Sequence, residues 1–102
     1  MAVIHVSRMD SMGSDLTVAN AARVSFAKHK EELDEGDEKL IKFLAEHGHW
    51  SPFSHVFMQF KIDAPIFVAR QLQKHQVGLA WNEVSRRYVD TEPEFYSPIE
   101  WR

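Results

Sequence analysis

The chain has 102 residues, of which 44% are hydrophobic and 12% aromatic, with a formal net charge of −3 at pH 7 and no cysteine. This length suits one small domain with a packed core, and the lack of cysteine excludes disulfides, thiolate metal sites and a cysteine nucleophile. No Lys/Arg-rich run, secretory signal or long apolar stretch is present, so we expect a soluble, cytoplasmic chain that binds neither nucleic acid nor membrane.

The amino-terminal part is predicted to form a strand, a turn and a short helix. Residues 2–7 are a β-prone run, and residues 9–14 are polar and contain Gly13, as is typical of a turn. Asp15 can cap a helix that runs to about Ala22. The highly charged residues 28–36 are expected to form a solvated, mobile loop.

The clearest predicted helix follows this loop. Asp37 is suited to the N-cap, and Gly48 is suited to the position just after the last helical residue. Between them, Leu40, Ile41, Leu44 and His47 recur at helical spacing.

The next elements are a second strand and a third helix. In residues 49–55, Pro52 blocks helix continuation and biases Ser51 toward an extended conformation. Residues 56–62 alternate with a period of two, which predicts a strand with one apolar face, and Pro65 opens a helix that runs to about His75. This order predicts an α+β (α/β) fold. Residues 91–102 carry two prolines and three aromatic residues including Trp101, so we expect a partner subunit or further residues to cover them.

Phosphate binding is the first chemistry that the sequence supports. The four glycines are too widely spaced for a nucleotide-binding glycine motif, so side-chain cations would have to hold any phosphate. Four cations fall close together in the sequence: Arg70, Lys74, Arg86 and Arg87. On one helix, Arg70 and Lys74 would share a face, as would Gln71 and His75. The alternative is an ordinary solvated helix face with a polar cap.

A second polar group lies in WNEVSRRY, residues 81–88. An amide, a carboxylate, a hydroxyl and two guanidinium groups stand between Trp81, Val84 and Tyr88, which would anchor one apolar face. A pyrimidine nucleotide needs such donors, acceptors and cations. The alternative is a local ion pair of Glu83 with an arginine.

The histidines and serines suggest neither a metal site nor a nucleophile. His47, His49 and His55 are close in sequence, but no H-E-x-x-H spacing exists, so we expect no metal site. His49 could be a hydrogen-bonding site residue or a packed capping histidine. No G-x-S-x-G motif surrounds a serine.

Taken together, residues 38–88 (EKLIKFLAEHGHWSPFSHVFMQFKIDAPIFVARQLQKHQVGLAWNEVSRRY) and AARVSF at 21–26 resemble the flavin-dependent thymidylate synthases, the thymidylate synthase complementing protein family. That family shows a helix ending in H-x-S/T-P-F/L-E-H, a strand, an F-x-x-R-Q helix, and R-H-R-x7-S followed by R-Y. The resemblance implies a single domain, residues 1–102, with an antiparallel sheet flanked by helices, similar to the amino-terminal part of the family fold.

The implied activity is the reductive methylation of dUMP to dTMP, a methyltransferase reaction with methylenetetrahydrofolate, FAD and NADPH in a homotetramer whose sites are shared between subunits. By resemblance, the residues that meet the flavin are His49, Ser51, Lys74, His75, Gln76, Val77, Asn82 and Glu83. Those that hold dUMP are Gln71, Lys74, Glu83, Ser85, Arg86 and Arg87, and Trp50 or Trp81 could stack on a ring.

Four departures from the family pattern bear on this assignment. The two arginines of R-H-R are Lys74 and Gln76 here, the spacing from His75 to Ser85 is one residue longer, and Ser54 stands where the family has glutamate. Gly78 could absorb the extra residue in a tight bend. The resemblance assigns no catalytic residue, because the arginine that favours ionisation of the uracil ring belongs to the family's carboxy-terminal half. The alternative function is therefore an incomplete, non-catalytic flavin- and nucleotide-binding fragment.

Overall fold

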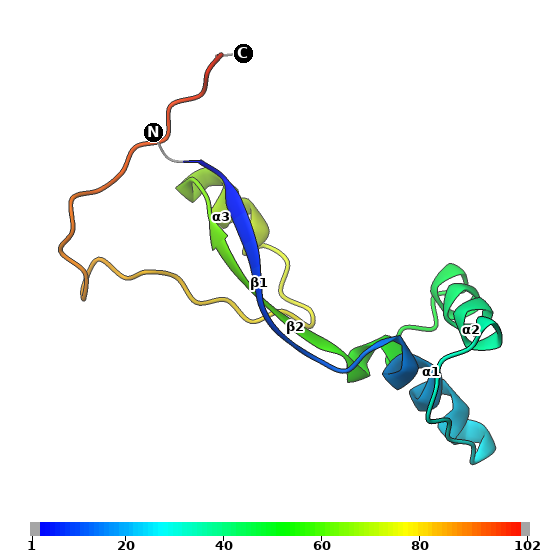
Figure 1. Ribbon diagram of the computed structural model, residues 1–102. Helices are drawn as coiled ribbons and strands as arrows, with labels where there is room; N and C mark the ends of the chain where they lie inside the picture. The colour runs from blue at the N-terminus through cyan, green and yellow to red at the C-terminus, as the bar shows by residue number, and fades with distance from the viewer. Residues whose placement is uncertain (1–2, 101–102) are drawn as a thin grey trace. The chain divides into compact units, whose positions relative to one another are not determined.

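The computed structural model describes residues 3–100, in which two strands are separated in sequence by helices and a further helix follows the second strand (Figure 1). The elements are β1 (His5–Met12), α1 (Asp15–Arg23), the 3₁₀ helix η1 (Val24–Phe26), α2 (Glu35–Glu46), the 3₁₀ helix η2 (Ser51–His55), β2 (Phe57–Asp63) and α3 (Ile66–Leu72). β1 and β2 pair into a two-stranded antiparallel sheet. The predicted combination of an antiparallel sheet with helices is confirmed.

The first strand is longer than the sequence predicted, and it begins later. Residues 9–12, expected to be a turn, belong to β1, and only Gly13 turns the chain, with a φ of 87°. Pairing with β2 supplies hydrogen bonds for residues 9–12 and overrides the local preference of Asp10 and Ser11 for a turn. Ala2, included in the predicted strand, lies outside the described residues.

The caps of α1 and α2 also differ from the prediction. Ser14, not Asp15, is the N-cap of α1, and its N–H donates to Thr17 Oγ1 over 2.9 Å. α2 starts after Asp34 instead of at Asp37, because the two aspartates cap each other: Asp34 Oδ1 accepts from the Asp37 N–H, and Asp37 Oδ2 accepts from the Asp34 N–H, both over 3.0 Å.

The end of α2 confirms the predicted glycine stop. Gly48 follows the C-cap with a φ of 68°, and its N–H donates to the Ala45 carbonyl over 3.3 Å. The His49 N–H donates to the Leu44 carbonyl over 2.9 Å. These two bonds make a Schellman motif, which fixes the direction in which the chain leaves the helix.

Two further expectations about the second half were wrong. Ser51 is not extended but begins η2, since the fixed φ of Pro52 suits the first turn of a helix. α3 ends at Leu72 rather than near His75, and tighter turns follow it, in which the N–H groups of Lys74 and His75 reach carbonyls three residues back. Lys74 therefore does not share a helix face with Arg70, nor His75 with Gln71.

The chain buries few side chains. Val18, Ala19 and Leu44 form the buried apolar core, all residues of β2 are exposed, and the chain exposes 9300 Å². No helix within residues 3–100 is long and apolar enough to cross a membrane.

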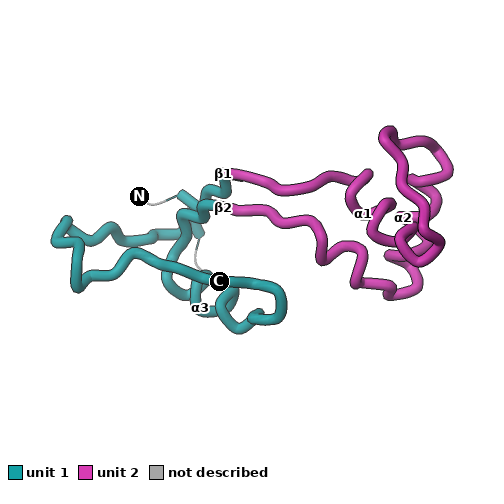
Figure 2. Tube along the Cα trace, turned by 90° about the horizontal axis from the view of Figure 1, so that it is seen from below, with its two compact units in different colours: residues 1–7, 61–102 teal, residues 8–60 magenta. Residues whose placement is uncertain are grey.

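The chain divides into two compact units, residues 1–7 with 61–102 and residues 8–60, and the division falls within both strands (Figure 2). The predicted site residues are divided as well. His49 and Ser51 belong to the second of these units, and all the others belong to the first.

Candidate nucleotide and flavin site

His49 lies three residues after the last residue of α2, at a position set by the Schellman motif. The Phe43 ring stacks with the His47 ring at a centroid distance of 4.1 Å, and with the His49 ring at 6.1 Å. One ring nitrogen of His47, Nδ1, lies 2.8 Å from the Phe43 carbonyl oxygen. Two residues further on, Ser51 opens η2. His49 and Ser51 are both exposed and accessible to a ligand.

A charged network holds the helices of the same unit together. The carboxylate of Asp37, which is completely buried, accepts from Arg23 Nε over 3.0 Å and from Lys30 Nζ over 2.6 Å. Arg23 ends α1 and Asp37 lies in the first turn of α2, so this carboxylate joins the two helices. Lys30 also pairs with Asp34. Its backbone N–H and carbonyl both bond to the Asn20 side chain, over 2.9 and 2.8 Å.

The network shifts the ionisation of its members. The bond from Lys30, opposed by burial and supported by Arg23, lowers the pKa of Asp37 far below its ordinary range. The bond from Lys30 also lowers the pKa of Asp34. In return, the bonds to Asp34 and Asp37 raise the pKa of Lys30 above its ordinary value of 10.5. The buried carboxylate of Asp37 is therefore matched by two cations, as burial of a charge requires.

In the other unit, the candidate flavin residues Lys74 to Val77 form the turns that follow α3. Gly78 adopts a φ of 71°, and the Leu79 N–H donates to the Gln76 carbonyl over 3.2 Å. A left-handed third residue is typical of a type II turn. The prediction that Gly78 makes a tight bend is confirmed.

Trp81 closes the same loop. Its Nε1–H donates to the carbonyl of His75 over 2.8 Å, across a separation of six residues. This bond brings the segment of Asn82 and Glu83 back to the end of α3, where Gln71 lies. The expectation that Trp81, Val84 and Tyr88 form an anchored apolar face is wrong for this chain, since Val84 and Tyr88 are 74% and 81% exposed.

Glu83 makes specific contacts with α3. Its Oε1 accepts from Arg70 Nη1 over 3.3 Å, and its Oε2 accepts from Gln73 Nε2 over 3.2 Å. Glu83 thus pairs with Arg70, and among the described residues the expected local ion pair with its neighbours Arg86 and Arg87 is not formed. Arg70 is consequently engaged by a carboxylate and is a weaker candidate for binding phosphate.

Ser85, Arg86 and Arg87 form a single turn. The carbonyl of Ser85 accepts from the N–H groups of Tyr88 and Val89 over 3.0 and 3.2 Å, and its hydroxyl accepts from Arg87 Nε over 3.3 Å. The Arg87 guanidinium lies over the Tyr88 ring, 5.3 Å from its centroid. Arg86 Nη1 donates to Thr91 Oγ1 over 3.4 Å.

Three cations of this unit are available to an anion. Within residues 3–100, Lys74, Arg86 and Arg87 form no ion pair with a carboxylate. Guanidinium and ammonium groups match phosphate oxygens, so the donor set suits a nucleotide or a dinucleotide cofactor.

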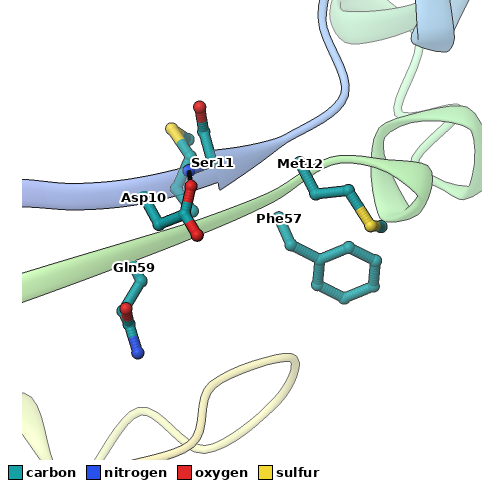
Figure 3. Close-up of a pocket in the computed structure, with 6 residues that line it drawn as sticks. Asp10, Ser11, Met12, Phe57 and Gln59 are labelled. Atoms are coloured by element: carbon teal, nitrogen blue, oxygen red, sulfur yellow. Dashed lines mark hydrogen bonds between the residues drawn. The ribbon is translucent and has the colours of Figure 1, made fainter.

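Other surfaces of the described chain offer less. A shallow hollow beside the two strands is lined by Asp10, Ser11, Met12, Phe57, Met58 and Gln59, none of which was a predicted site residue (Figure 3). Within the described residues, no three His, Asp or Glu side chains are arranged to hold a metal ion.

The sequence did not reveal which side chains form hydrogen bonds with one another in the folded chain. Nothing in the spacing paired Gln73 with Glu83, ten residues apart, or Arg23 with Asp37, fourteen residues apart. The only local signal was the pair of aspartates at positions 34 and 37, which is the spacing of a reciprocal cap.

These features define an α+β chain whose cations, carboxylate and amides suit a phosphorylated ligand. The sequence profile of the family described as "Thymidylate synthase complementing protein" matches residues 8–102. The flavin-dependent thymidylate synthase of Thermosipho africanus is 47% identical over 90 residues, which cover 88% of this chain and 39% of that protein. That of Thermus thermophilus is 42% identical over 97 residues, 95% of this chain and 35% of that protein.

A solved structure agrees. The UMP/dUMP methylase PolB from Streptomyces cacaoi, bound with 5-Br dUMP, superposes with a TM-score of 0.76 at 42% identity, covering 88% of this chain and 39% of PolB. This chain belongs to the thymidylate synthase complementing protein family, as its sequence motifs predicted. It spans about two-fifths of the length of these relatives.

Proposed function

We propose that this chain carries part of the dUMP and flavin site of a flavin-dependent thymidylate synthase, which converts dUMP to dTMP with methylenetetrahydrofolate, FAD and NADPH. The likeness to PolB, a UMP/dUMP methylase bound to 5-Br dUMP, carries this proposal. The proposed assembly is a homotetramer with shared sites.

The residues of the 61–102 unit fit the binding of a pyrimidine nucleotide. Arg86 and Arg87 supply donors for the phosphate, and the hydroxyl of Ser85 adds a further donor. The Gln71 amide can both donate to and accept from the edge of the base, while the carboxylate of Glu83 accepts from a sugar hydroxyl or a ring N–H.

A second set of residues would hold the flavin. Lys74 offers a cation for its pyrophosphate, and the exposed polar groups of His75, Gln76 and Asn82 offer hydrogen bonds. In the residue 8–60 unit, His49 and Ser51 are exposed and are further candidates for contact with a flavin. When bound, reduced FAD would supply the hydride for the reduction.

The test is a titration of the purified chain with FAD, with and without dUMP, followed by flavin absorbance. A saturable spectral change that responds to dUMP supports the proposal, and a chain that binds neither ligand contradicts it. A parallel titration with UMP measures how strongly the site prefers the deoxyribose.

Arg87→Ala sharpens this test, with Arg8→Ala on β1 as a control that removes the same charge elsewhere. Loss of a charge-assisted bond to phosphate should weaken dUMP binding by about 1–3 kcal/mol, or roughly 5- to 150-fold in Kd. Equal affinities of the two variants would remove Arg87 from the site. Binding without formation of dTMP from methylenetetrahydrofolate would instead favour the second candidate, a binding module without turnover.

A further inference from the structure

Three side chains at the end of α3 form a closed ring of hydrogen bonds. Arg70 Nη1 donates to Gln73 Oε1 over 3.2 Å and to Glu83 Oε1 over 3.3 Å. Gln73 Nε2 completes the ring by donating to Glu83 Oε2 over 3.2 Å. Both oxygens of one carboxylate are thus held by two residues of one helix end.

The orientation of the Gln73 amide in this ring is forced by chemistry. A guanidinium only donates hydrogen bonds and an ionised carboxylate only accepts them. The amide must therefore turn its oxygen to Arg70 and its nitrogen to Glu83. No other orientation satisfies both neighbours. The ring therefore requires a side chain with both a donor and an acceptor at position 73, whereas an exposed helix end by itself would accept many residue types.

The two residues that donate to Glu83 belong to α3 and its C-cap, whereas Glu83 itself lies outside any helix or strand. Gln73 is the C-cap of α3, and its N–H still donates to the Ala69 carbonyl over 2.9 Å. Glu83 lies in a segment without regular secondary structure. The hydrogen bonds of the ring therefore hold the Glu83 carboxylate at a fixed position relative to α3.

We propose that Arg70 and Gln73 are positioning residues that fix the carboxylate of Glu83 for a hydroxyl or N–H donor of the bound nucleotide. This inference rests on the proposed function, because it takes Glu83 to be a ligand-binding residue. Each carboxylate oxygen can accept more than one hydrogen bond, so the ring leaves Glu83 able to accept from the nucleotide. Arg70 and Gln73 act through Glu83 and need not touch the ligand.

The decisive variant is Gln73→Glu, which preserves size and helix propensity but replaces the donor facing Glu83 with an acceptor. Gln59→Glu on β2 adds the same charge outside the ring and serves as the matched control. Arg70→Gln removes the cation, and Arg70→Lys restores a cationic donor. All are made in the full 102-residue chain.

Two readouts are needed. The first is the ¹³C NMR shift of the Glu83 carboxyl carbon without ligand, which should move in Gln73→Glu and Arg70→Gln but not in Gln59→Glu. The second is the Kd for dUMP, which should rise about two- to fivefold in Arg70→Gln, as befits an exposed charge pair, and recover in Arg70→Lys. Gln73→Glu should raise it at least as much.

The outcomes separate this inference from the proposed function. An unmoved Glu83 carbon, or a moved carbon with dUMP affinity equal to that of Gln59→Glu, overturns the positioning role. If the unaltered chain binds no dUMP, the proposed function fails for this chain, and the NMR shift alone decides whether Arg70 and Gln73 hold Glu83.

Discussion

The two units of the chain use charge in opposite ways. In residues 8–60, the carboxylate of Asp37 is fully buried and accepts from Arg23, Lys30 and the Asp34 backbone. In the other unit, the pair of Arg70 and Glu83 is more than half and about half exposed, at 58% and 50%. Buried ion pairs make the local structure intolerant of change, while exposed pairs contribute little stability and leave their groups accessible. The residue 8–60 unit therefore depends on a buried, fully paired carboxylate, whereas the 61–102 unit leaves its charged side chains accessible.

Removing the buried charge should have the largest effect. Asp37→Asn keeps the shape of the side chain but leaves Arg23 and Lys30 without their buried counter-ion. We expect the thermal midpoint of the chain to fall on the order of 10 °C or more, measured by circular dichroism. Glu38→Gln, one residue away and exposed, is the control, and an equal loss in both variants would contradict a special role for the network.

Lowering the pH should destabilise the chain for the same reason as Asp37→Asn, because protonation removes the charge of the carboxylates. The pKa values of Asp37 and Asp34 are lowered in the folded chain, so their contribution to stability is present above the ordinary carboxyl value of 3.8. It is lost as the pH falls below that value toward the folded pKa values. Urea unfolding between pH 5 and pH 2 should show a falling midpoint, less steep in Asp37→Asn, and parallel curves would argue against the network as the cause.

Substituting one positive-φ glycine in each unit compares how far the two units tolerate a side chain at such a position. Gly13→Ala adds about 1–2 kcal/mol of left-handed strain and places a Cβ only 3.1 Å from Val56 Cγ2, so it should destabilise the residue 8–60 unit clearly. Gly78→Ala also places alanine at a positive φ, but no atom lies within 4 Å of the new Cβ. Its cost in stability is therefore the left-handed backbone strain alone. Chemical denaturation should rank Gly13→Ala as more destabilising. The reverse order would show that the loop of the 61–102 unit is the tighter of the two.

The smallest effect is expected from Trp81→Phe. The aromatic ring is kept, but the bond from Nε1–H to the His75 carbonyl is lost, which amounts to about 1 kcal/mol confined to the loop. Global stability should hardly change, while amide hydrogen exchange of Leu79 should become faster. Exchange as slow as in the unaltered chain would mean that the Gly78 turn holds the loop without Trp81.

Much of the fold could be predicted from the sequence because its signals are local. Gly48 ends α2 as expected, and the alternating residues of β2 and the proline before α3 marked those elements correctly. The boundaries that failed depend on distant or competing contacts. β1 extends through residues 9–12 because β2 pairs with it, and local propensity does not predict that pairing.

In the candidate site, too, local features could be predicted from the sequence and contacts between distant residues could not. The residue types that suit a pyrimidine nucleotide were visible in WNEVSRRY, and family membership is confirmed by the profile match. The partners of those residues were not visible, since Arg70 and Glu83 lie thirteen positions apart. The early end of α3 at Leu72 also removed the helix face on which Arg70 and Lys74 were expected to meet. The roles of the individual residues in binding remain predictions.

The two-stranded sheet has a consequence for how the chain behaves in solution. β1 and β2 pair only with each other among the described residues, so each strand keeps one edge of unpaired backbone N–H and C=O groups. A strand that adds to either edge binds the folded sheet and not the unfolded chain. By mass action, a strand that pairs with either edge would raise the melting temperature of this sheet as the concentration of that strand increases.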